Sequence, residues 1–277
     1  MKGLRQLFDF YINSSIHVAL AVVSLSWLTL LEFDISYDGS ILIFIFFASV
    51  TGYNFVKYFG LAKFHHRSLA NWLKLIQAFS FFCFVLMCFY AFKIEPKTLL
   101  YILGLGVITF LYAIPFLPKR FLFDEKQNLR NVGGIKIYVI ALVWSGVTVI
   151  LPLVNNDIAI SEDVIVTAIQ RFVFVIVLTL PFEIRDLQFD SLKLATIPQK
   201  IGEQWTKIMG MILLVLFYFL EFFKIELDWK SLIIVSMITL MTFLLLICAK
   251  KNQGRYYSGF WVEGIPIFWL LLVLVFQ

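Results

Sequence analysis

The sequence predicts one all-α domain that crosses a membrane many times, and three observations lead to this fold class. The composition is 61% hydrophobic and only 15% charged, whereas soluble domains are about half apolar and about a quarter charged. Long apolar runs recur along the chain and are joined by short connections. Basic residues gather in every second connection. We therefore treat residues 1–277 as a single transmembrane domain.

Nine apolar runs have the length of a membrane-spanning helix, which needs about 20 residues to cross about 30 Å of hydrocarbon. In chain order they are Phe8–Leu31, Ser40–Phe59, Trp72–Phe92, Leu99–Leu117, Ile137–Val154, Val164–Phe182, Ile208–Phe223, Ser231–Cys248 and Phe260–Phe276. No low-complexity or Gly/Ser-rich linker divides them into groups. The expected arrangement is an all-α polytopic membrane protein with nine transmembrane helices in one bundle.

The distribution of lysine and arginine predicts the orientation. With the N-terminus in the cytoplasm, eighteen of the 23 basic residues lie in cytoplasmic segments, four lie in outer connections and Arg171 lies inside a run. Basic residues accumulate on the cytoplasmic side of membrane proteins. We expect a cytoplasmic N-terminus and a C-terminus on the opposite side. Topology thus explains the net charge of +5, and no nucleic-acid partner is expected.

Charged residues gather where the sixth run leaves the membrane. If the helix continues beyond its apolar part, Asp186 and Asp190 lie on one face, because residues four apart are neighbours on a helix. Two carboxylates on one face can hold Mg²⁺, which also takes oxygen from a substrate phosphate. Arg185 and Lys193 would add phosphate contacts. The alternative is a solvated, charged boundary without a ligand.

A second polar region, at the end of the second run and in the connection after it, contains no acidic residue. Asn54 and Lys57 lie three residues apart, on about the same helix face, and Arg67 follows them. Another basic pair, Lys119 and Arg120, follows the fourth run. Cationic side chains bind phosphate oxygens directly, so these residues are predicted to contact an anionic ligand.

The stretch after the sixth run resembles the second aspartate-rich motif of the UbiA-type intramembrane prenyltransferases. The residues that carry the resemblance are Glu183, Arg185, Asp186, Asp190, Lys193, Thr196, Pro198 and Gly202. Tyr112 and the pair Lys119–Arg120 are similar to the family's tyrosine and basic pair after the fourth helix. The resemblance implies a nine-helix UbiA-like bundle that moves an isoprenyl chain from its diphosphate to a hydrophobic acceptor, with Mg²⁺ as cofactor.

The first aspartate-rich motif departs from the family pattern. That motif reads N-D-x-x-D, whereas this chain has Asn54-Phe55-Val56-Lys57-Tyr58. Phe55 and Tyr58 stand where the aspartates are expected, so one metal site lacks its protein ligands. Lys57 supplies positive charge at the same place.

Three functions are compatible with these residues. In a divergent but active prenyltransferase, Asp186 and Asp190 are the catalytic and metal-binding residues. The diphosphate would then contact Asn54, Lys57, Arg67, Lys119, Arg120, Arg185 and Lys193. The second function is non-catalytic binding of a lipid or membrane partner. The third is a small transporter, although the runs lack the paired glycine or proline breaks of many transporters.

Two ionisable residues lie inside apolar runs, where such residues are functional candidates. Arg171 and Glu263 differ in depth by about 15 Å at the rise of an α-helix, so we expect no direct pair between them. Glu263 is expected to join the cytoplasmic site, and Arg171 to extend outward. Four polar residues early in the first run would form helix–helix hydrogen bonds or line the mouth of the site and contact an acceptor: Asn13, Ser14, Ser15 and His17.

Overall fold

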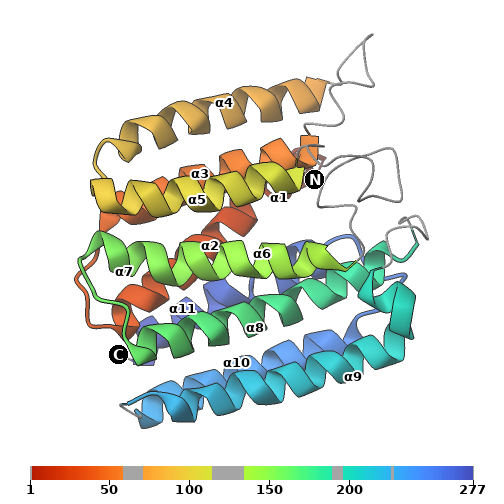
Figure 1. The fold of residues 1–277 in the computed structure, drawn as a ribbon. Helices are drawn as coiled ribbons and strands as arrows, with labels where there is room; N and C mark the ends of the chain where they lie inside the picture. Colours follow the sequence, from red (N-terminus) through yellow and green to blue (C-terminus); the bar gives the residue numbers. More distant parts are fainter. Residues whose placement is uncertain (1, 59–70, 114–133, 189–195, 226–227, 277) are drawn as a thin grey trace, which may run out of the picture.

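The structure, a computed structural model, describes residues 2–58, 71–113, 134–188, 196–225 and 228–276. These residues form helices and no strand. The elements are α1 (Lys2–Asn13), α2 (Ile16–Glu32), α3 (Gly39–Tyr58), α4 (Asn71–Ala91), α5 (Pro96–Ala113), α6 (Ile135–Ser145), η4 (Gly146–Ile150), α7 (Leu151–Asn155), α8 (Glu162–Asp186), α9 (Ile197–Leu220), η6 (Glu221–Phe223), α10 (Trp229–Cys248), η7 (Tyr257–Val262) and α11 (Ile265–Phe276). They form one bundle (Figure 1). We call the end where α1 begins the inner end, and the end where α11 finishes the outer end.

Seven helices in the described residues are long and apolar enough to cross a membrane. They are α3, α4, the continuous stretch from α6 to α7, α8, α9, α10, and η7 with α11. The bent pair of α1 and α2 adds an eighth if it counts as one span, and the apolar stretch of α5 falls short of the same length. A multi-pass membrane fold is confirmed, whereas the count of nine spans stays a prediction.

The first predicted helix, Phe8–Leu31, is two helices. α1 and α2 meet at an angle of 53°, and Ser15 between them has the left-handed backbone angle φ 64°. A non-glycine residue in this conformation interrupts a right-handed helix. Ser14 and Ser15 are both fully buried. The polar residues at this position form a helix break, which we call the inner break (residues 13–15). Ser15 also forms a side-chain hydrogen bond to another helix, at Asn54 of α3, as expected.

The seventh predicted helix begins at Ile197 instead of Ile208. Its first turn is capped, because Gln199 Oε1 accepts a hydrogen bond of 3.1 Å from the Thr196 backbone amide. Pro198 fits this turn because the N–H that proline lacks has no helical partner there. Gly202 then interrupts α9 with φ 81° and ψ 165°. Capping thus extends the helix into a stretch of mixed polarity that hydropathy alone does not assign to it.

α8 is the central helix of the bundle. In its most apolar stretch 67% of the residues are buried, whereas the corresponding share for α4 is 17%. Phe174 of α8 packs against Phe217 and Trp269 with ring centroids 5.1 and 5.3 Å away. α9 approaches α8 and α10 closely at Gly210, where a Cβ atom would lie 2.7 Å from Leu180 and 2.5 Å from Leu246. Small residues permit such close helix packing in membranes.

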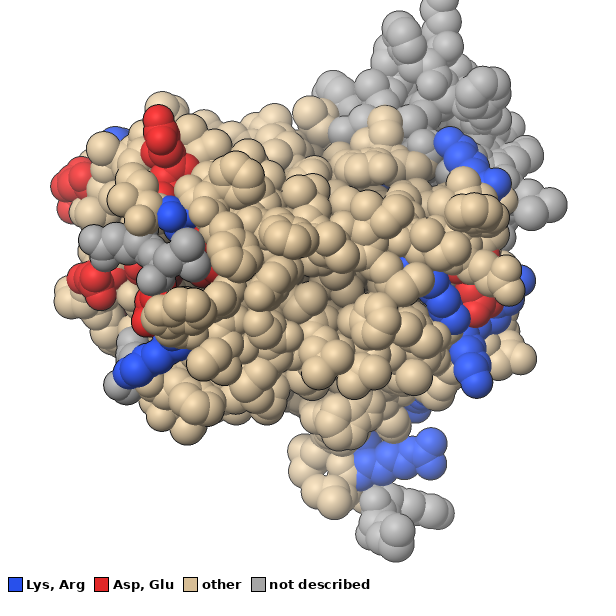
Figure 2. Space-filling view, turned by 90° about the horizontal axis from the view of Figure 1, so that it is seen from below, with Lys and Arg blue, Asp and Glu red and all other residues tan. Residues whose placement is uncertain are grey.

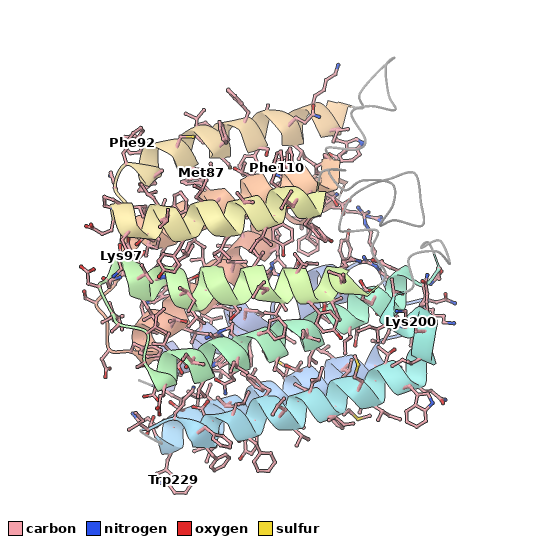
Figure 3. All side chains as sticks on the ribbon, viewed as in Figure 1. Met87, Phe92, Lys97, Phe110, Lys200 and Trp229 are labelled. Atoms are coloured by element: carbon pink, nitrogen blue, oxygen red, sulfur yellow. The ribbon has the colours of Figure 1, made fainter. Side chains whose placement is uncertain are left out.

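The surface has the polarity of a membrane protein. Charged side chains gather at the two ends of the bundle, and an apolar belt lies between them (Figure 2). Lys97 and Trp229 lie at the outer end and Lys200 at the inner end (Figure 3). Large apolar side chains such as Phe81 and Ile212 are 69% and 64% exposed, as expected where lipid replaces water around the protein.

Candidate functional site

Four of the predicted site residues lie at the inner end, close to the inner break. Asn54 and Lys57 are in the last turns of α3, and Arg185 and Asp186 are the last two residues of α8. The other predicted site residues, Arg67, Lys119, Arg120, Asp190 and Lys193, lie outside the described residues. Their roles stay predictions.

Asn54 holds the inner break in place. Its side chain is 3% exposed, and its Nδ2 donates a hydrogen bond of 3.0 Å to the Ser14 carbonyl oxygen. Ser15 Oγ donates to Asn54 Oδ1 at 2.9 Å. Both ends of the amide are therefore bonded to the break. This geometry favours a structural role for Asn54 over the predicted diphosphate contact.

Two further residues of α3 also contact the inner break. Tyr58 donates its hydroxyl to the Asn13 carbonyl oxygen at 2.8 Å. Lys57 Nζ donates to Ser15 Oγ at 3.2 Å, and the residue is otherwise exposed. An ammonium group has three donors, so Lys57 retains donors for an anionic ligand.

Arg185 and Asp186 form an ion pair at the end of α8. Arg185 Nε donates to Asp186 Oδ1 at 2.8 Å, and Nη2 lies 2.8 Å from the same oxygen. The Arg185 guanidinium also lies 5.3 Å from the centre of the Phe182 ring. α8 ends at Asp186, and Asp190 lies outside the described residues, so the predicted face with both aspartates stays a prediction.

A buried ion pair that the sequence analysis did not single out lies beside this site. Lys136 Nζ is 2.6 Å from Glu183 Oε1, and Glu183 is 3% exposed. Asp186 and Tyr112 also act electrostatically on Lys136. In the sequence, Lys136 cannot be distinguished from the other basic residues that flank spans, because its partner Glu183 lies on another helix.

Glu263 joins the inner site, as predicted. It follows η7 directly and is half-buried. Lys57 from α3 and Arg185 from α8 both act electrostatically on its carboxylate. Within the described part of the chain, its side chain forms no hydrogen bond or ion pair. The inner end therefore combines two cations and an unpaired carboxylate contributed by three separate helices.

The described residues offer one ligand for a magnesium ion. They contain no group of three His, Cys, Asp or Glu side chains placed to hold a metal. Both bonds from Arg185 end on Oδ1 of Asp186, and Oδ2 makes no hydrogen bond within the described residues. Asp186 thus fits Mg²⁺ as a single carboxylate ligand, and the pair with Asp190 stays a prediction.

Arg171 belongs to a buried cluster near the outer end, well away from Glu263. Its guanidinium lies 4.9 Å from the centre of the Trp269 ring, and Glu32 and Glu221 act on it electrostatically. Lys224 forms ion pairs with both of these carboxylates. Burial lowers the pKa of Lys224, but the two carboxylates raise it by a larger amount. The pKa therefore lies above its ordinary value. We call Arg171, Lys224, Glu32 and Glu221 the outer charge cluster.

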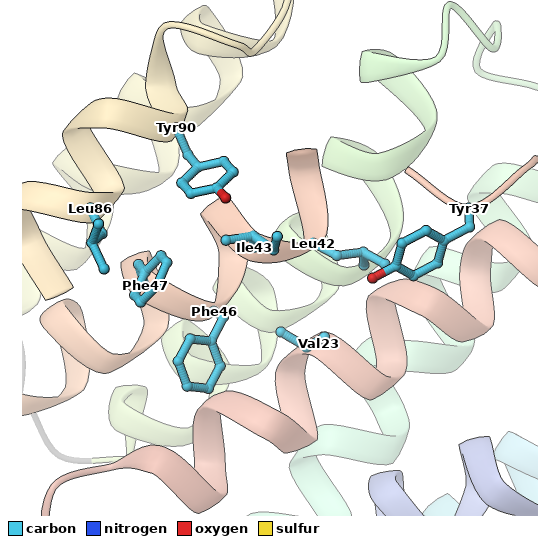
Figure 4. Close-up of a pocket in the computed structure, with 8 residues that line it drawn as sticks. All are labelled: Val23, Tyr37, Leu42, Ile43, Phe46, Phe47, Leu86 and Tyr90. Atoms are coloured by element: carbon cyan, nitrogen blue, oxygen red, sulfur yellow. The ribbon is translucent and has the colours of Figure 1, made fainter. Parts of the chain in front are cut away.

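An apolar pocket of about 460 Å³ lies between α2, α3 and α4. Its lining residues are Val23, Tyr37, Leu42, Ile43, Phe46, Phe47, Leu86 and Tyr90 (Figure 4). No sequence motif indicates this pocket, because its lining residues come from separate elements.

Comparisons with known proteins identify the fold. No family model and no curated protein matches the sequence. A structure of digeranylgeranylglyceryl phosphate synthase is similar, with 14% identity, a TM-score of 0.56 and coverage of 98% of this chain and 97% of that one. A UbiA homologue from Archaeoglobus fulgidus bound to GPP and Mg²⁺ has 13% identity, a TM-score of 0.65 and coverage of 97% and 99%. Another structure of a UbiA homologue from the same organism has 14% identity, a TM-score of 0.53 and coverage of 100% and 99%.

Proposed function

We propose that this chain, which has the fold of the UbiA-type intramembrane prenyltransferases, is a divergent prenyltransferase that moves an isoprenyl chain from its diphosphate to a hydrophobic acceptor. One observation carries the proposal. Lys57 and Arg185, far apart in the sequence, both act on the half-buried Glu263 at the inner end. Cations at one end of an apolar bundle suit a ligand with an anionic head and a hydrocarbon tail.

The chemistry needs charge stabilisation more than reactive side chains. Lys57 and Arg185 donate to the diphosphate oxygens, and the prenyl chain lies among apolar side chains. When the bond between C1 and the diphosphate oxygen breaks, its electron pair leaves with the diphosphate, whose charge the two cations stabilise. The face of Tyr53, one helical turn before Lys57, can stabilise positive charge on the prenyl carbon. The acceptor then forms a bond to C1.

The remaining predicted residues have assigned roles in this proposal. Bound Mg²⁺ would offset the charge of the diphosphate, and we assign Asp186 and Asp190 as its protein ligands. The UbiA homologue bound to GPP and Mg²⁺ supports this kind of ligand and cofactor. The further phosphate contacts are assigned to Arg67, Lys119, Arg120 and Lys193.

Non-catalytic binding of a lipid or membrane partner is the second candidate function. The observation that favours it is the engagement of the altered first motif with the inner break. Asn54 and Tyr58 bond residues 13–15 instead of facing a ligand. A chain that kept the fold but used this region for stability would bind lipid without ionising a diphosphate.

We also propose a topology of nine spans, with α5 and the bent pair of α1 and α2 each crossing the membrane. The N-terminus then lies in the cytoplasm and the C-terminus on the opposite side. The eighteen basic residues in the segments assigned to the inner side support this orientation.

Binding of a non-hydrolysable geranyl diphosphate analogue tests the proposed function. Purified protein is titrated with the analogue in Mg²⁺ and in EDTA. We expect binding that needs Mg²⁺ and weakens at least tenfold in Asp186→Asn and in Lys57→Ala, because a hydrogen bond to a charged group contributes about 1.5–3 kcal/mol.

Matched variants at the outer end serve as controls. Asp228→Asn makes the same substitution at a helix N-cap, where asparagine is equally suitable. Lys97→Ala removes a lysine from an exposed ion pair. Both should bind like the wild type. Metal-independent binding that is lost only in Lys57→Ala would remove the magnesium assignment, and no binding in either buffer would favour the non-catalytic function.

A further inference from the structure

Glu263 differs from the other acidic residues that the structure describes at the inner end. Asp9, Glu183, Asp186 and Glu203 each form an ion pair with a basic side chain. Within the described residues, the Glu263 side chain forms no ion pair and no hydrogen bond, although it is half-buried. A carboxylate removed from water is costly unless a partner satisfies it. A bound ligand with a hydrogen-bond donor would be such a partner.

The backbone that carries Glu263 is fixed by contacts to the start of α2. A Cβ atom at Gly264 would lie 3.4 Å from His17 Nε2. That nitrogen donates to the Phe260 carbonyl oxygen at 2.9 Å, so the other ring nitrogen, Nδ1, accepts from the Tyr11 hydroxyl at 2.7 Å. The His17 ring also stacks on Phe260. Glu263 therefore extends from a segment whose position is already determined before a ligand arrives.

The groups around Glu263 come from several elements and indicate what it can bind. Lys57 from α3 and Arg185 from α8 act electrostatically on its carboxylate, and Tyr53 from α3 and Tyr11 from α1 lie near enough to be influenced by its charge. The two cations suit the diphosphate of the proposed function. The carboxylate suits a neutral O–H donor, whereas an acidic acceptor would place a second negative charge beside it.

We infer that Glu263 binds the hydroxyl group of a neutral lipid alcohol and accepts its proton as the prenyl group is transferred. This inference rests on the proposed prenyl transfer. The hydroxyl oxygen forms the new bond to C1 of the prenyl chain, and the bond from C1 to the diphosphate oxygen breaks with its electron pair on the diphosphate. The hydroxyl proton moves to a Glu263 carboxylate oxygen and then to solvent. The products are an ether and diphosphate.

Equilibrium binding to protein in lipid nanodiscs tests this inference with two probes that differ in one group. The probes are radiolabelled hexadecanol and hexadecyl methyl ether, which lacks the O–H donor, each corrected for binding to empty nanodiscs. Wild-type protein should bind the alcohol about tenfold more tightly than the ether, the discrimination expected of a charge-assisted hydrogen bond. Glu263→Gln should reduce this ratio to about twofold or less, and Glu263→Asp should retain part of it.

The control and the second readout separate the two proposals. Glu203→Gln removes a carboxylate from a helical ion pair at the same end and should keep the wild-type ratio. The geranyl diphosphate analogue should bind Glu263→Gln at least as tightly as wild type, because the substitution removes a negative charge that acts on Lys57 and Arg185. This binding also shows that the variant is folded. The inference is overturned if wild type binds the alcohol and the ether equally well. It is also overturned if Glu263→Gln keeps the wild-type preference for the alcohol. If wild-type protein does not bind the geranyl diphosphate analogue, the proposed function is contradicted, whatever the result with the alcohol and the ether.

Discussion

At the scale of single residues, the last turns of α3 support the backbone of the inner break. Asn54 bonds both serines of the inner break, and Tyr58 bonds Asn13. These contacts satisfy polar groups that the surrounding apolar bundle would otherwise leave unpaired. The residues of the altered motif therefore stabilise the kinked start of the chain.

Replacing Asn54 tests this role. Asn54→Ala should lower the free energy of unfolding by about 1–3 kcal/mol, because it leaves the Ser14 carbonyl and the Ser15 hydroxyl without their partner. Thermal unfolding in detergent measures the change. Asn252→Ala, in an exposed turn at the same end, is the matched control and should unfold like the wild type. Equal stability of the two variants would contradict the structural role.

The residues of the candidate site were only partly predictable. Lys57, Arg185 and Asp186 could be identified because their charge is conspicuous in an apolar chain. The bonding of Asn54 to the break could not, because it depends on a left-handed serine that the sequence pattern does not show. Lys136 and Glu183 were separated by 47 positions, and only packing reveals such a pair.

At the scale of elements, hydropathy predicted most spans and missed two features of local geometry. Apolar runs reveal where a helix can lie in lipid, so α3, α4, α8 and α10 were placed closely. The division of the first run at residues 13–15 arises from side chains that bond across helices. The early start of α9 arises from capping at Thr196, which average hydropathy does not register.

A substitution at Gly202 tests how much the start of α9 depends on the unusual backbone conformation of this glycine. Its φ of 81° and ψ of 165° lie in a region that is essentially restricted to glycine. Gly202→Ala should therefore lower the free energy of unfolding by about 1–3 kcal/mol, measured by thermal unfolding. Gly254→Ala is a suitable comparison, because its Cβ would meet no atom within 4 Å and its φ is not positive. The idea fails if both substitutions have the same small effect.

At the scale of the whole molecule, the two ends of the bundle differ in charge while the belt between them is apolar (Figure 2). Among the described basic residues that predicted the orientation, Lys57, Arg185 and Lys200 lie at the inner end. The fold is shared across nearly the full length of structures only 13–14% identical to this chain. The fold is therefore shared although few individual residues are identical.

The orientation can be measured with single cysteines in a background without Cys83, Cys88 and Cys248. Lys97→Cys lies at the outer end and Lys200→Cys at the inner end (Figure 3). In intact cells, a membrane-impermeant thiol reagent should label Lys97→Cys and spare Lys200→Cys until the membrane is permeabilised. The opposite labelling pattern would reverse the proposed orientation, and the cysteine-free parent controls for background labelling.

The outer charge cluster has a consequence for how the protein responds to a transmembrane voltage. A voltage of 100 mV does about 2.3 kcal/mol of work on each elementary charge that crosses the whole field. The formal charges of Arg171 and Lys224 cancel those of Glu32 and Glu221. The two carboxylates act electrostatically on Arg171 and form ion pairs with Lys224. If the outer halves of these helices shift together along the membrane normal, the field does almost no net work on the cluster. The cluster therefore adds almost no voltage dependence to such a movement.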